Sequence, residues 1–385
     1  MKAAETGKGT AKYILGEVKR FDQKNEMFKR ARWQPELREM AKKVYGSVYP
    51  KDKDGHTLKD MAFKNAAWHI ETGFAHGTII HNTGMYAWDM KLVGVSQVPP
   101  GLKLEVDDPA KMSQDIKKVA KFFGASQVGI CELDRRWVYS HSFHILTREH
   151  KELELPEGYK YAIVMVFEMD YELAKTSPTW VAEGTEGKAY SMMAVTATMV
   201  AQFIRGLGYK AIPSGNDTAI SIPLAIDAGL GELGRNGLLI TPQYGPLVRI
   251  SKVLTDLPLV PDEPIEFGVT RYCEKCKKCA KYCPGQAILW GERTTEPNNI
   301  SNASGELKWP IDAEKCFAFW ARNEGSCMNC IRVCPFNKPA GWLHNIIRWL
   351  VKHTPGLDSL LVKMDDLFGY GKQASAKIFW NNIVA

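Results

Sequence analysis

Residues 273–284 read CEKCKKCAKYCP, and residues 316–335 read CFAFWARNEGSCMNCIRVCP. The first stretch has the spacing C-x2-C-x2-C-x3-C-P, and the second has C-x10-C-x2-C-x3-C-P. Of the nine cysteines, only Cys131 lies outside these stretches, in an apolar run that suits a buried core position. Disulfide frameworks belong to short secreted chains, and this chain has 385 residues. The two stretches therefore predict metal binding.

This spacing is typical of bacterial two-cluster ferredoxins, in which the cysteine before proline ligates the other cluster. The first [4Fe–4S] cluster is then expected to take Cys273, Cys276, Cys279 and Cys334. The second is expected to take Cys283, Cys316, Cys327 and Cys330. Two zinc sites are the alternative, but Cys-Pro ends fit zinc ribbons poorly. A module of this kind transfers electrons, so the 267 residues before it should hold a redox centre or a docking surface for a partner.

The composition, with 45% hydrophobic and 24% charged residues, is that of a globular protein of two or three domains. The net charge of +7 is spread along the chain without a block of like charges, so we expect no nucleic-acid binding. No apolar run approaches the 18 residues of a transmembrane helix. The first residues, MKAAETGKGTAKYILG, lack the apolar region of a signal peptide.

Hydrophobic periodicity predicts helices and strands in alternation between residues 108 and 259. Residues 108–125 and 191–209 read as helices, while residues 126–133 and 160–169 read as buried strands. Residues 237–259 contain two strands around a Gly-Pro turn. This order predicts an α+β fold with helices packed on a largely antiparallel sheet. The tail is expected to contain one amphipathic helix, GWLHNIIRWLVKH, at residues 341–353.

Residues 190–259, the two cysteine runs and LLVKMDDLFGYGK at 360–372 resemble the cobalamin-dependent reductive dehalogenases. The most specific strings are AGLGELGRNGLLITPQYGPLVRISKVLTDLPL and CFAFWARNEGSCMNCIRVCPFNKP. The resemblance covers about residues 110–372. It implies a nitroreductase-like core that binds a corrinoid, a bacterial-ferredoxin-like domain, and reductive removal of halide from small organohalides. The expected units are a helical and loop region (1–112), the core (113–267), the cluster domain (268–338) and a tail (339–385).

Three positions match catalytic positions of that family: Tyr190, Asn216 and Arg249. The reaction needs a proton, and a phenol can supply it to the carbon that loses halide. A nearby guanidinium would stabilise the tyrosinate and lower the pKa of the phenol. The Asn216 amide could anchor either the halogen or the Tyr190 hydroxyl. The resemblance thus implies Tyr190 as proton donor beside a Co(I) corrinoid that receives electrons from two [4Fe–4S] clusters.

The resemblance also places Trp320 near the substrate pocket, and Phe28, Trp33 and Trp88 are plausible lids. An aromatic chamber suits chlorinated hydrocarbons, which offer little to hydrogen-bond. The histidines of WHIETGFAHGTIIHNTGMYAW (68–88) lack metal-ligand spacing, and a pocket wall is the alternative role of this segment. Glycines that let a backbone approach a flat ligand are expected at the cofactor. They are Gly215, Gly229, Gly231, Gly234 and Gly237.

The string GLGELG is not a GxGxxG motif after a strand, so dinucleotide binding is rejected. No DxHxxG string occurs, so a histidine ligand to the cobalt is not expected. The resemblance implies a base-off corrinoid without a protein ligand below the cobalt. Epoxyqueuosine reductase, which acts on tRNA, is an alternative, but its family pattern has an acidic donor where Tyr190 stands. A non-catalytic iron–sulfur electron-transfer protein is a second alternative.

The substrate could be a chloroethene or a chlorinated C1 or C2 alkane such as chloroform or trichloroethane. The resemblance further implies a small membrane-anchor protein, a low-potential electron donor and possibly a homodimer as partners. It implies a mature form on the outer face of the cytoplasmic membrane after twin-arginine export. Arg135-Arg136 is internal and is no export signal.

Overall fold

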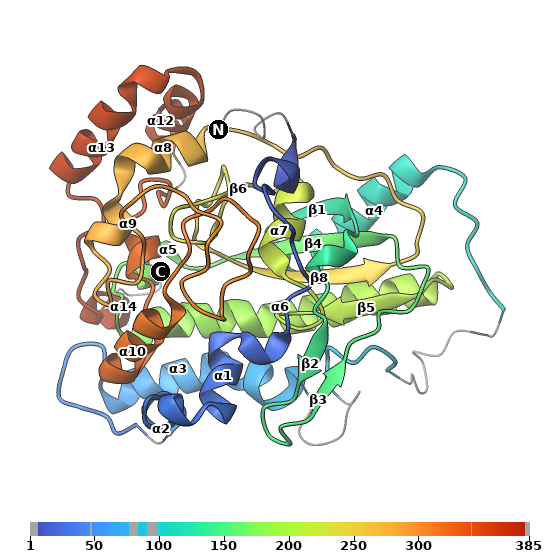
Figure 1. Cartoon of the computed structure of the whole chain (residues 1–385), viewed down its shortest axis with the longest axis horizontal. Coiled ribbons are helices and arrows are strands. Elements are labelled where there is room, and N and C mark those ends of the chain that lie inside the picture. Colours follow the sequence, from blue (N-terminus) through green and yellow to red (C-terminus); the bar gives the residue numbers. More distant parts are fainter. Residues whose placement is uncertain are drawn as a thin grey trace.

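The computed structural model describes residues 7–46, 48–76, 84–90, 99, 101–339 and 341–381. Its centre is a four-stranded sheet in the order β1–β4–β8–β5, and all neighbouring strands are antiparallel (Figure 1). The sheet strands are β1 (Gln127–Glu132), β4 (Tyr161–Glu168), β5 (Ala211–Ser214) and β8 (Val248–Thr255). The predicted α+β class with a largely antiparallel sheet is confirmed.

The other elements surround this sheet. The short strands are β2 (His141–Phe143), β3 (His150–Glu152), β6 (Glu232–Leu233) and β7 (Leu239–Ile240). The helices before the cysteine runs are α1 (Met27–Trp33), α2 (Arg38–Tyr45), α3 (Leu58–Ile70), α4 (Pro109–Phe122), α5 (Tyr171–Ala174), α6 (Trp180–Gly206) and α7 (Ser221–Asp227). The helices from there onward are α8 (Val269–Cys276), α9 (Lys278–Lys281), α10 (Ala313–Asn323), α11 (Asn329–Arg332), α12 (Trp342–His353), α13 (Asp358–Leu367) and α14 (Lys377–Asn381).

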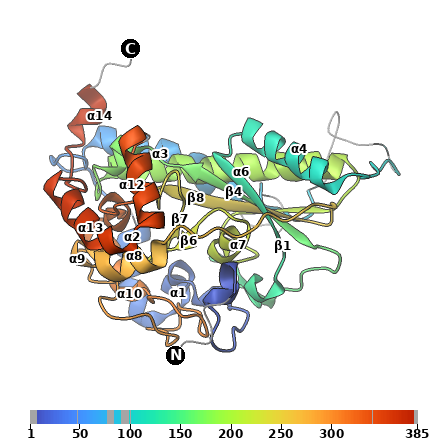
Figure 2. The ribbon, with the colours of Figure 1, turned by 90° about the horizontal axis from the view of Figure 1, so that it is seen from above.

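The sheet lies between two helical layers (Figure 2). Side chains alternate along a strand, so successive residues of β4 enter opposite cores: Met165 packs with α4 and α6, and Val166 packs with α7. The same alternation applies to β8. Val253 lies in the core on the α6 side, and Leu254 lies in the core on the α7 side. Arg249 is an even number of residues from Val253 and therefore points to the same face of the sheet, the α6 side. Lys252 points to the same face as Leu254, the α7 side.

Helix α6 begins at Trp180, eleven residues before the predicted start at Ser191. Glycines at 184 and 187 disfavour a helix by local propensity, which is why the sequence pattern missed this half. The tertiary structure uses them for close packing with α3. A Cβ atom on Gly184 would lie 2.2 Å from the Phe63 ring, and one on Gly187 would lie 2.5 Å from the Trp68 ring. The contact between α3 and α6 therefore overrides propensity.

The tail contains more helix than we predicted. The amphipathic helix at residues 341–353 is present as α12, but α13 and α14 follow it. Helix α14 contacts α3 in the N-terminal part of the chain, where the Trp380 indole donates a hydrogen bond to Asp60 Oδ1 at 2.7 Å. Among the described helices, none has the length and apolar character that a membrane span requires.

Candidate active site and metal centre

Tyr190 and Asn216 meet above the sheet. Tyr190 lies in the middle of α6 rather than at a helix start, and Asn216 follows β5 in a turn. The Asn216 side-chain amide donates a hydrogen bond to Tyr190 Oη at 3.0 Å. Asn216 is exposed although Gly215 and Thr218 beside it are buried, so the pair borders an open space. Of the two roles expected for this amide, the structure displays the contact with the tyrosine hydroxyl.

Arg249 of β8 lies next to Tyr190, because its side chain points to the α6 side of the sheet. Its Nη2 donates to Glu186 Oε1 at 2.6 Å, and its guanidinium lies 5.5 Å from the Tyr190 ring centroid. Glu186 precedes Tyr190 by four residues and therefore projects from the same face of α6. Sequence reasoning did not select Glu186, although this spacing is a signal that could have identified it. The three predicted catalytic residues thus lie together, with one added carboxylate.

The electrostatic surroundings favour a protonated tyrosine. Burial raises the pKa of the Tyr190 hydroxyl, and the Arg249 guanidinium opposes that increase. Glu186 adds to the increase, whereas the Asn216 hydrogen bond reduces it. The expectation that Arg249 lowers this pKa holds for its own contribution, but burial is the largest effect. A raised pKa keeps the phenol protonated at neutral pH, as a proton donor requires.

A buried lysine on the α7 side of the sheet forms hydrogen bonds with the turn that contains Asn216. Lys252 is fully buried on the α7 side of β8, and its ammonium donates to the Gly215 carbonyl and to Ser221 Oγ. Burial lowers the pKa of Lys252 to about 8. The Asp217 carboxylate accepts from the Gly215 N–H at 2.8 Å. These bonds fix the backbone on the N-terminal side of Asn216 and so orient its amide.

The segment suspected as a pocket wall does lie against Tyr190. The Trp68 ring stacks on the Tyr190 ring, with centroids 5.0 Å apart and an interplanar angle of 24°. Trp68 Nε1 and Tyr86 Oη are buried without a hydrogen-bond partner among the described residues. His76 Nε2 lies 3.1 Å from Glu71 Oε1, while His81 lies outside the described residues.

The four predicted pocket aromatics do not form one cluster. Phe28 and Trp320 are in contact, with ring centroids 5.3 Å apart, and Trp320 Nε1 is buried without a described partner. The Trp88 indole donates to Thr218 Oγ1 at 3.2 Å, next to the Asn216 turn. The Trp33 indole donates to the Lys24 carbonyl, and no ring contact of Trp33 is found in the described part of the chain. Phe28, Trp320 and Trp88 are therefore the better-placed candidates.

The eight cysteines fall into the two predicted groups. The first group lines one small cavity: Cys273, Cys276, Cys279 and Cys334. In the second group, burial raises the pKa of the Cys316 thiol to about 12 and that of Cys327 to about 11, and the neighbouring Cys283 raises both further. Cys283 also raises the pKa of the Cys330 thiol. Each Cys-Pro cysteine thus stands with the three cysteines of the other run.

The sulfur spacing argues against zinc. A tetrahedral site with Zn–S bonds of about 2.3 Å holds its sulfurs about 3.8 Å apart. In the described part of the chain, which includes all eight cysteines, no three of their sulfurs lie within 4.8 Å of one another. Buried thiols that raise one another's pKa also need a cationic centre to become thiolates. The need for a cationic centre holds for any metal, whereas the sulfur spacing fits four thiolates around a larger iron–sulfur cluster.

The predicted cofactor glycines pack mainly against protein. A Cβ on Gly231 would lie 2.2 Å from the Ile240 carbonyl oxygen, and one on Gly215 would lie 2.7 Å from the Tyr86 ring. All five glycines have protein neighbours at 2.2–2.8 Å from such a Cβ: Gly215, Gly229, Gly231, Gly234 and Gly237. Gly237, with φ +71°, is the one that lines a cavity of about 270 Å³. The role of these five glycines in holding a cofactor stays a prediction.

That cavity lies between the first residues of the chain, α7 and the loop before α10. Hydroxyl and amide groups of Tyr13, Tyr139, Ser301 and Asn302 line it, together with aliphatic side chains. The Tyr139 hydroxyl also lies 3.4 Å from the Asn216 carbonyl oxygen, so the cavity adjoins the Tyr190 site. The charged side chains of Glu26, Glu306 and Lys308 also line the cavity, and its polar groups together can hydrogen-bond the amide side chains of a macrocycle. The residues present therefore fit the corrinoid that the resemblance implies.

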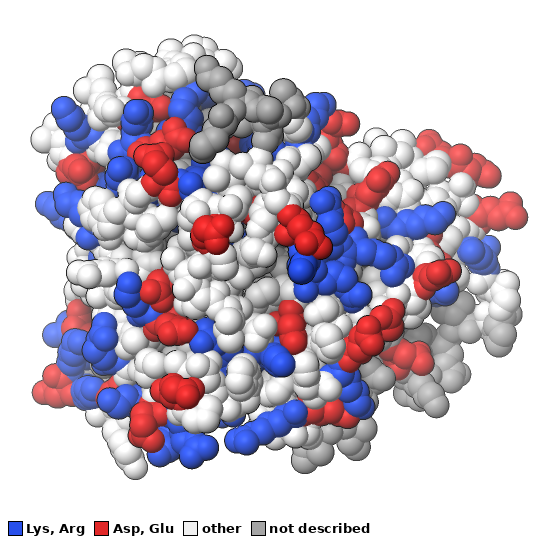
Figure 3. Space-filling model, in the orientation of Figure 1, with Lys and Arg blue, Asp and Glu red and all other residues white. Residues whose placement is uncertain are grey.

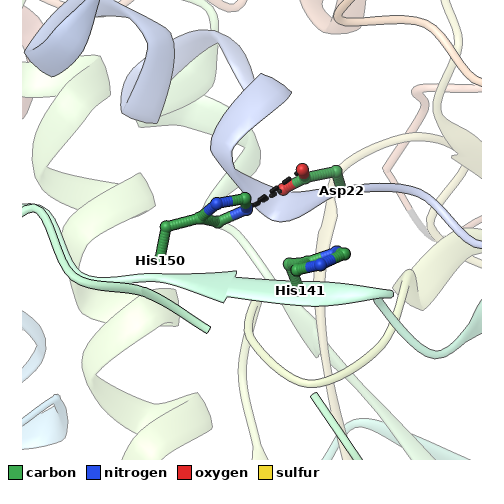
Figure 4. Close-up of side chains that lie close together, drawn as sticks. All are labelled: Asp22, His141 and His150. Carbon is green, nitrogen blue, oxygen red and sulfur yellow. Dashed lines mark hydrogen bonds and ion pairs between the residues drawn. The ribbon is translucent and has the colours of Figure 1, made fainter. Parts of the chain in front are cut away.

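A separate polar cluster joins the N-terminal segment to the β2–β3 hairpin (Figure 4). His150 Nε2 lies 3.0 Å from both Asp22 carboxylate oxygens, and the His141 and His150 rings stack at 4.8 Å. The Lys24 ammonium is 3.8 Å from the same carboxylate. The Asp22 carboxylate thus has both His150 and Lys24 as partners.

Comparison with known proteins identifies relatives over most of the chain. Residues 149–259 match the family model described as a reductive dehalogenase subunit, and residues 272–338 match a 4Fe–4S dicluster domain. The chain is 37% identical over 361 residues to a tetrachloroethene reductive dehalogenase of Sulfurospirillum multivorans, covering 85% of this chain and 71% of that protein. A Desulfitobacterium hafniense enzyme of the same name is 38% identical over 352 residues, covering 78% of this chain and 63% of that protein.

The fold is also that of a solved structure. The catabolic reductive dehalogenase NpRdhA matches with a TM-score of 0.73 and 24% identity, covering 94% of this chain and 48% of that chain. The chain thus spans about half the length of that protein. An epoxyqueuosine reductase of Lactococcus garvieae is 26% identical over 134 residues, which is 31% of this chain. The similarity to the tRNA-modifying enzyme is therefore weaker and shorter.

Proposed function

Because the chain belongs to the reductive dehalogenase family, we propose that it is an oxidoreductase that removes halide from small organohalides. Reductive dehalogenases bind a corrinoid and 4Fe–4S clusters, and the residues described above fit both groups. The observation that carries the proposal is the juxtaposition of Tyr190, Asn216 and Arg249 beside a cavity and a dicluster domain.

The proposed net reaction adds two electrons and one proton to R–X and yields R–H and X⁻. When bound, the corrinoid supplies the low-potential metal centre at which the carbon–halogen bond breaks. The Tyr190 hydroxyl donates the proton. The Asn216 amide, 3.0 Å from that hydroxyl, holds it towards the open space. The Arg249 guanidinium stabilises the phenolate that remains, and Glu186 holds the guanidinium in place.

The two cysteine groups deliver the electrons. Each would hold one [4Fe–4S] cluster, and Cys330 of the second group also influences Cys279 of the first, so the two clusters are neighbours. The second group is close to the active site, because Ser326, beside Cys327, donates its N–H to Glu183 Oε2 on α6 at 3.0 Å. Electrons would therefore pass from the first cluster to the second and then to the site on α6.

Small chlorinated hydrocarbons are the substrates that the site suits best. Aromatic rings of Trp68, Phe28 and Trp320 offer apolar surface and few hydrogen bonds. We propose chloroethenes or chlorinated C1 and C2 alkanes, such as chloroform or trichloroethane.

The test is anaerobic assay of the holoprotein, containing clusters and corrinoid, with reduced viologen as electron donor. We expect chloride release and a product with one halogen fewer from at least one of tetrachloroethene, trichloroethene, chloroform and trichloroethane. The same protein prepared without corrinoid is the control and should release no chloride. Absence of chloride release from the whole panel, with full iron and cobalt content, would contradict the proposed function.

We also propose that the protein works at the outer face of the cytoplasmic membrane, with a small anchor protein, a low-potential electron donor and a possible second copy as partners. The exposed apolar face of α12 supports this. Trp342 is 75% exposed and Trp349 is 57% exposed, with Leu343 and Ile346 between them. In Figure 3, charged side chains of both signs are interspersed over the visible face. Co-purification from membranes, compared between the natural chain and Trp342→Ser/Trp349→Ser, tests the anchoring, and size-exclusion chromatography tests the dimer.

A further inference from the structure

The loop between β6 and β7 contributes two polar side chains to the first cysteine group. Arg235 and Asn236 line the same cavity as Cys273, Cys276 and Cys279. They belong to the glycine run that the sequence assigned to the corrinoid. The structure instead directs these two side chains to the place of the first cluster.

Arg235 brings a buried positive charge that has no ion-pair partner among the described residues, although the Glu292 carboxylate acts on it from a greater distance. It is 2% exposed, and its guanidinium donates to the carbonyl oxygens of Cys273, Leu289 and Gly291 at 2.9, 2.7 and 3.0 Å. It also lies 4.4 Å from the Trp309 ring centroid. All these partners are neutral. Within the described ranges, no carboxylate lies at ion-pair distance from Arg235.

The other buried cations near this group are neutralised. Lys278 pairs with Asp365 and Asp366, and Lys338 pairs with Asp365 at 2.9 Å. Arg235 therefore differs from them in leaving a net positive charge beside the four thiolates. In the low-dielectric interior, such a charge acts over several ångströms.

Asn236 brings an unused hydrogen-bond donor. It is 7% exposed, and its Oδ1 accepts from the Leu238 N–H at 3.3 Å. A backbone N–H can only donate, so this contact fixes the orientation of the amide. The Nδ2 atom is then left buried without a partner among the described residues. A cluster sulfur in the shared cavity is the acceptor that would satisfy it.

One-electron reduction adds one negative charge to a [4Fe–4S] cluster, and nearby cations and hydrogen bonds to sulfur favour that reduced state. We propose that Arg235 and Asn236 raise the reduction potential of the first cluster, Arg235 by its buried positive charge and Asn236 by a hydrogen bond to a cluster sulfur. The core thereby sets the potential at which the ferredoxin-like domain accepts an electron. This inference concerns the cluster alone and holds whatever the halogenated substrate is.

The experiment is an EPR-monitored redox titration of the intact holoprotein, with the electrode and viologen mediators supplying the electron. The variants are Arg235→Met, Arg235→Lys and Asn236→Leu, each with its iron content measured. At the natural midpoint potential, Arg235→Met should lower the reduced-to-oxidised ratio of the first cluster at least tenfold, which for one electron is about 59 mV. Asn236→Leu should lower this ratio as well, and Arg235→Lys should lower it less than Arg235→Met.

Arg20→Met is the matched control. Arg20 also donates to three backbone carbonyls, those of Val138, Tyr139 and Leu153, but it lies outside the cysteine module. The control should leave both midpoint potentials unchanged. The second cluster should keep its potential in all variants.

Several results would overturn the proposal. Unchanged first-cluster potentials in Arg235→Met and Asn236→Leu, with full iron content, would do so. Equal shifts of both clusters, or equal effects of Arg235→Met and Arg235→Lys, would remove the charge argument. If Arg235→Met loses iron, Asn236→Leu decides alone: a lowered first-cluster potential supports the proposal and an unchanged one refutes it.

Discussion

Tyr190 can be replaced by phenylalanine with little change in packing, because only the hydroxyl that contacts Asn216 is lost. We expect Tyr190→Phe to lower the rate of halide release by about 10²–10⁴-fold, the usual contribution of a positioned acid. Corrinoid and iron content should stay normal, since the ring still stacks on Trp68. Halide release is measured together with cobalt and iron content. A near-natural rate with normal cofactors would show that another group is the donor.

Arg249 and Glu186 should shift the pH dependence in opposite directions. The protonated tyrosine is the active form, so the rate falls as pH rises through the pKa of Tyr190. Arg249 lowers this pKa and Glu186 raises it. Arg249→Met should therefore move the alkaline limb of the pH–rate profile to higher pH, and Glu186→Gln should move it to lower pH. Arg249→Lys keeps the charge and should lose less rate than Arg249→Met. Shifts of the same sign in Arg249→Met and Glu186→Gln would contradict this account.

At the scale of elements, the glycines of α6 let α3 approach and place Trp68 on Tyr190. A methyl group at position 187 would meet the Trp68 ring at 2.5 Å. We expect Gly187→Ala to destabilise the protein by about 1–3 kcal/mol, the usual cost of overpacking. The thermal unfolding midpoint and the tryptophan fluorescence of the holoprotein report the change.

Gly73→Ala is the matched control for this prediction. Gly73 lies in the π-helical turn Glu71–Ala75 that follows α3, and a Cβ atom there meets nothing within 4 Å. Its effect should stay within about 0.5 kcal/mol. Equal unfolding midpoints of the two variants would show that α3 can move away from α6 at no cost.

At the scale of the whole molecule, each group of four cysteines contains the Cys-Pro cysteine of the other run. The holoprotein should contain about eight iron atoms and essentially no zinc. Cys283→Ala should reduce the EPR signal of the second cluster, although Cys283 lies in the first run. Cys334→Ala should affect the first cluster in the same way. If each variant instead perturbs the cluster of its own run, the exchange of ligands is wrong.

Features that depend on local pattern were predictable from the sequence. The cysteine spacing indicated two clusters with exchanged ligands, because the loop geometry around a cubane constrains the spacing. Apolar runs indicated β1 and β4, since a strand buried on both faces needs apolar side chains on both. The family resemblance supplied Tyr190, Asn216 and Arg249, and the structure brings them together.

Only the tertiary structure could reveal contacts between distant segments. Trp68 reaches Tyr190 across more than a hundred residues, and the extension of α6 to Trp180 depends on that packing against local propensity. The pairing of Glu186 with Arg249 depends on β8 facing α6, which only the folded structure shows. The glycine run is predicted to lie at a cofactor, and only the tertiary structure shows that Arg235 and Asn236 within it line the cavity of the first cysteine group. Sequence pattern reports local spacing and periodicity, whereas burial, charge pairing and close approach arise only when the chain folds back on itself.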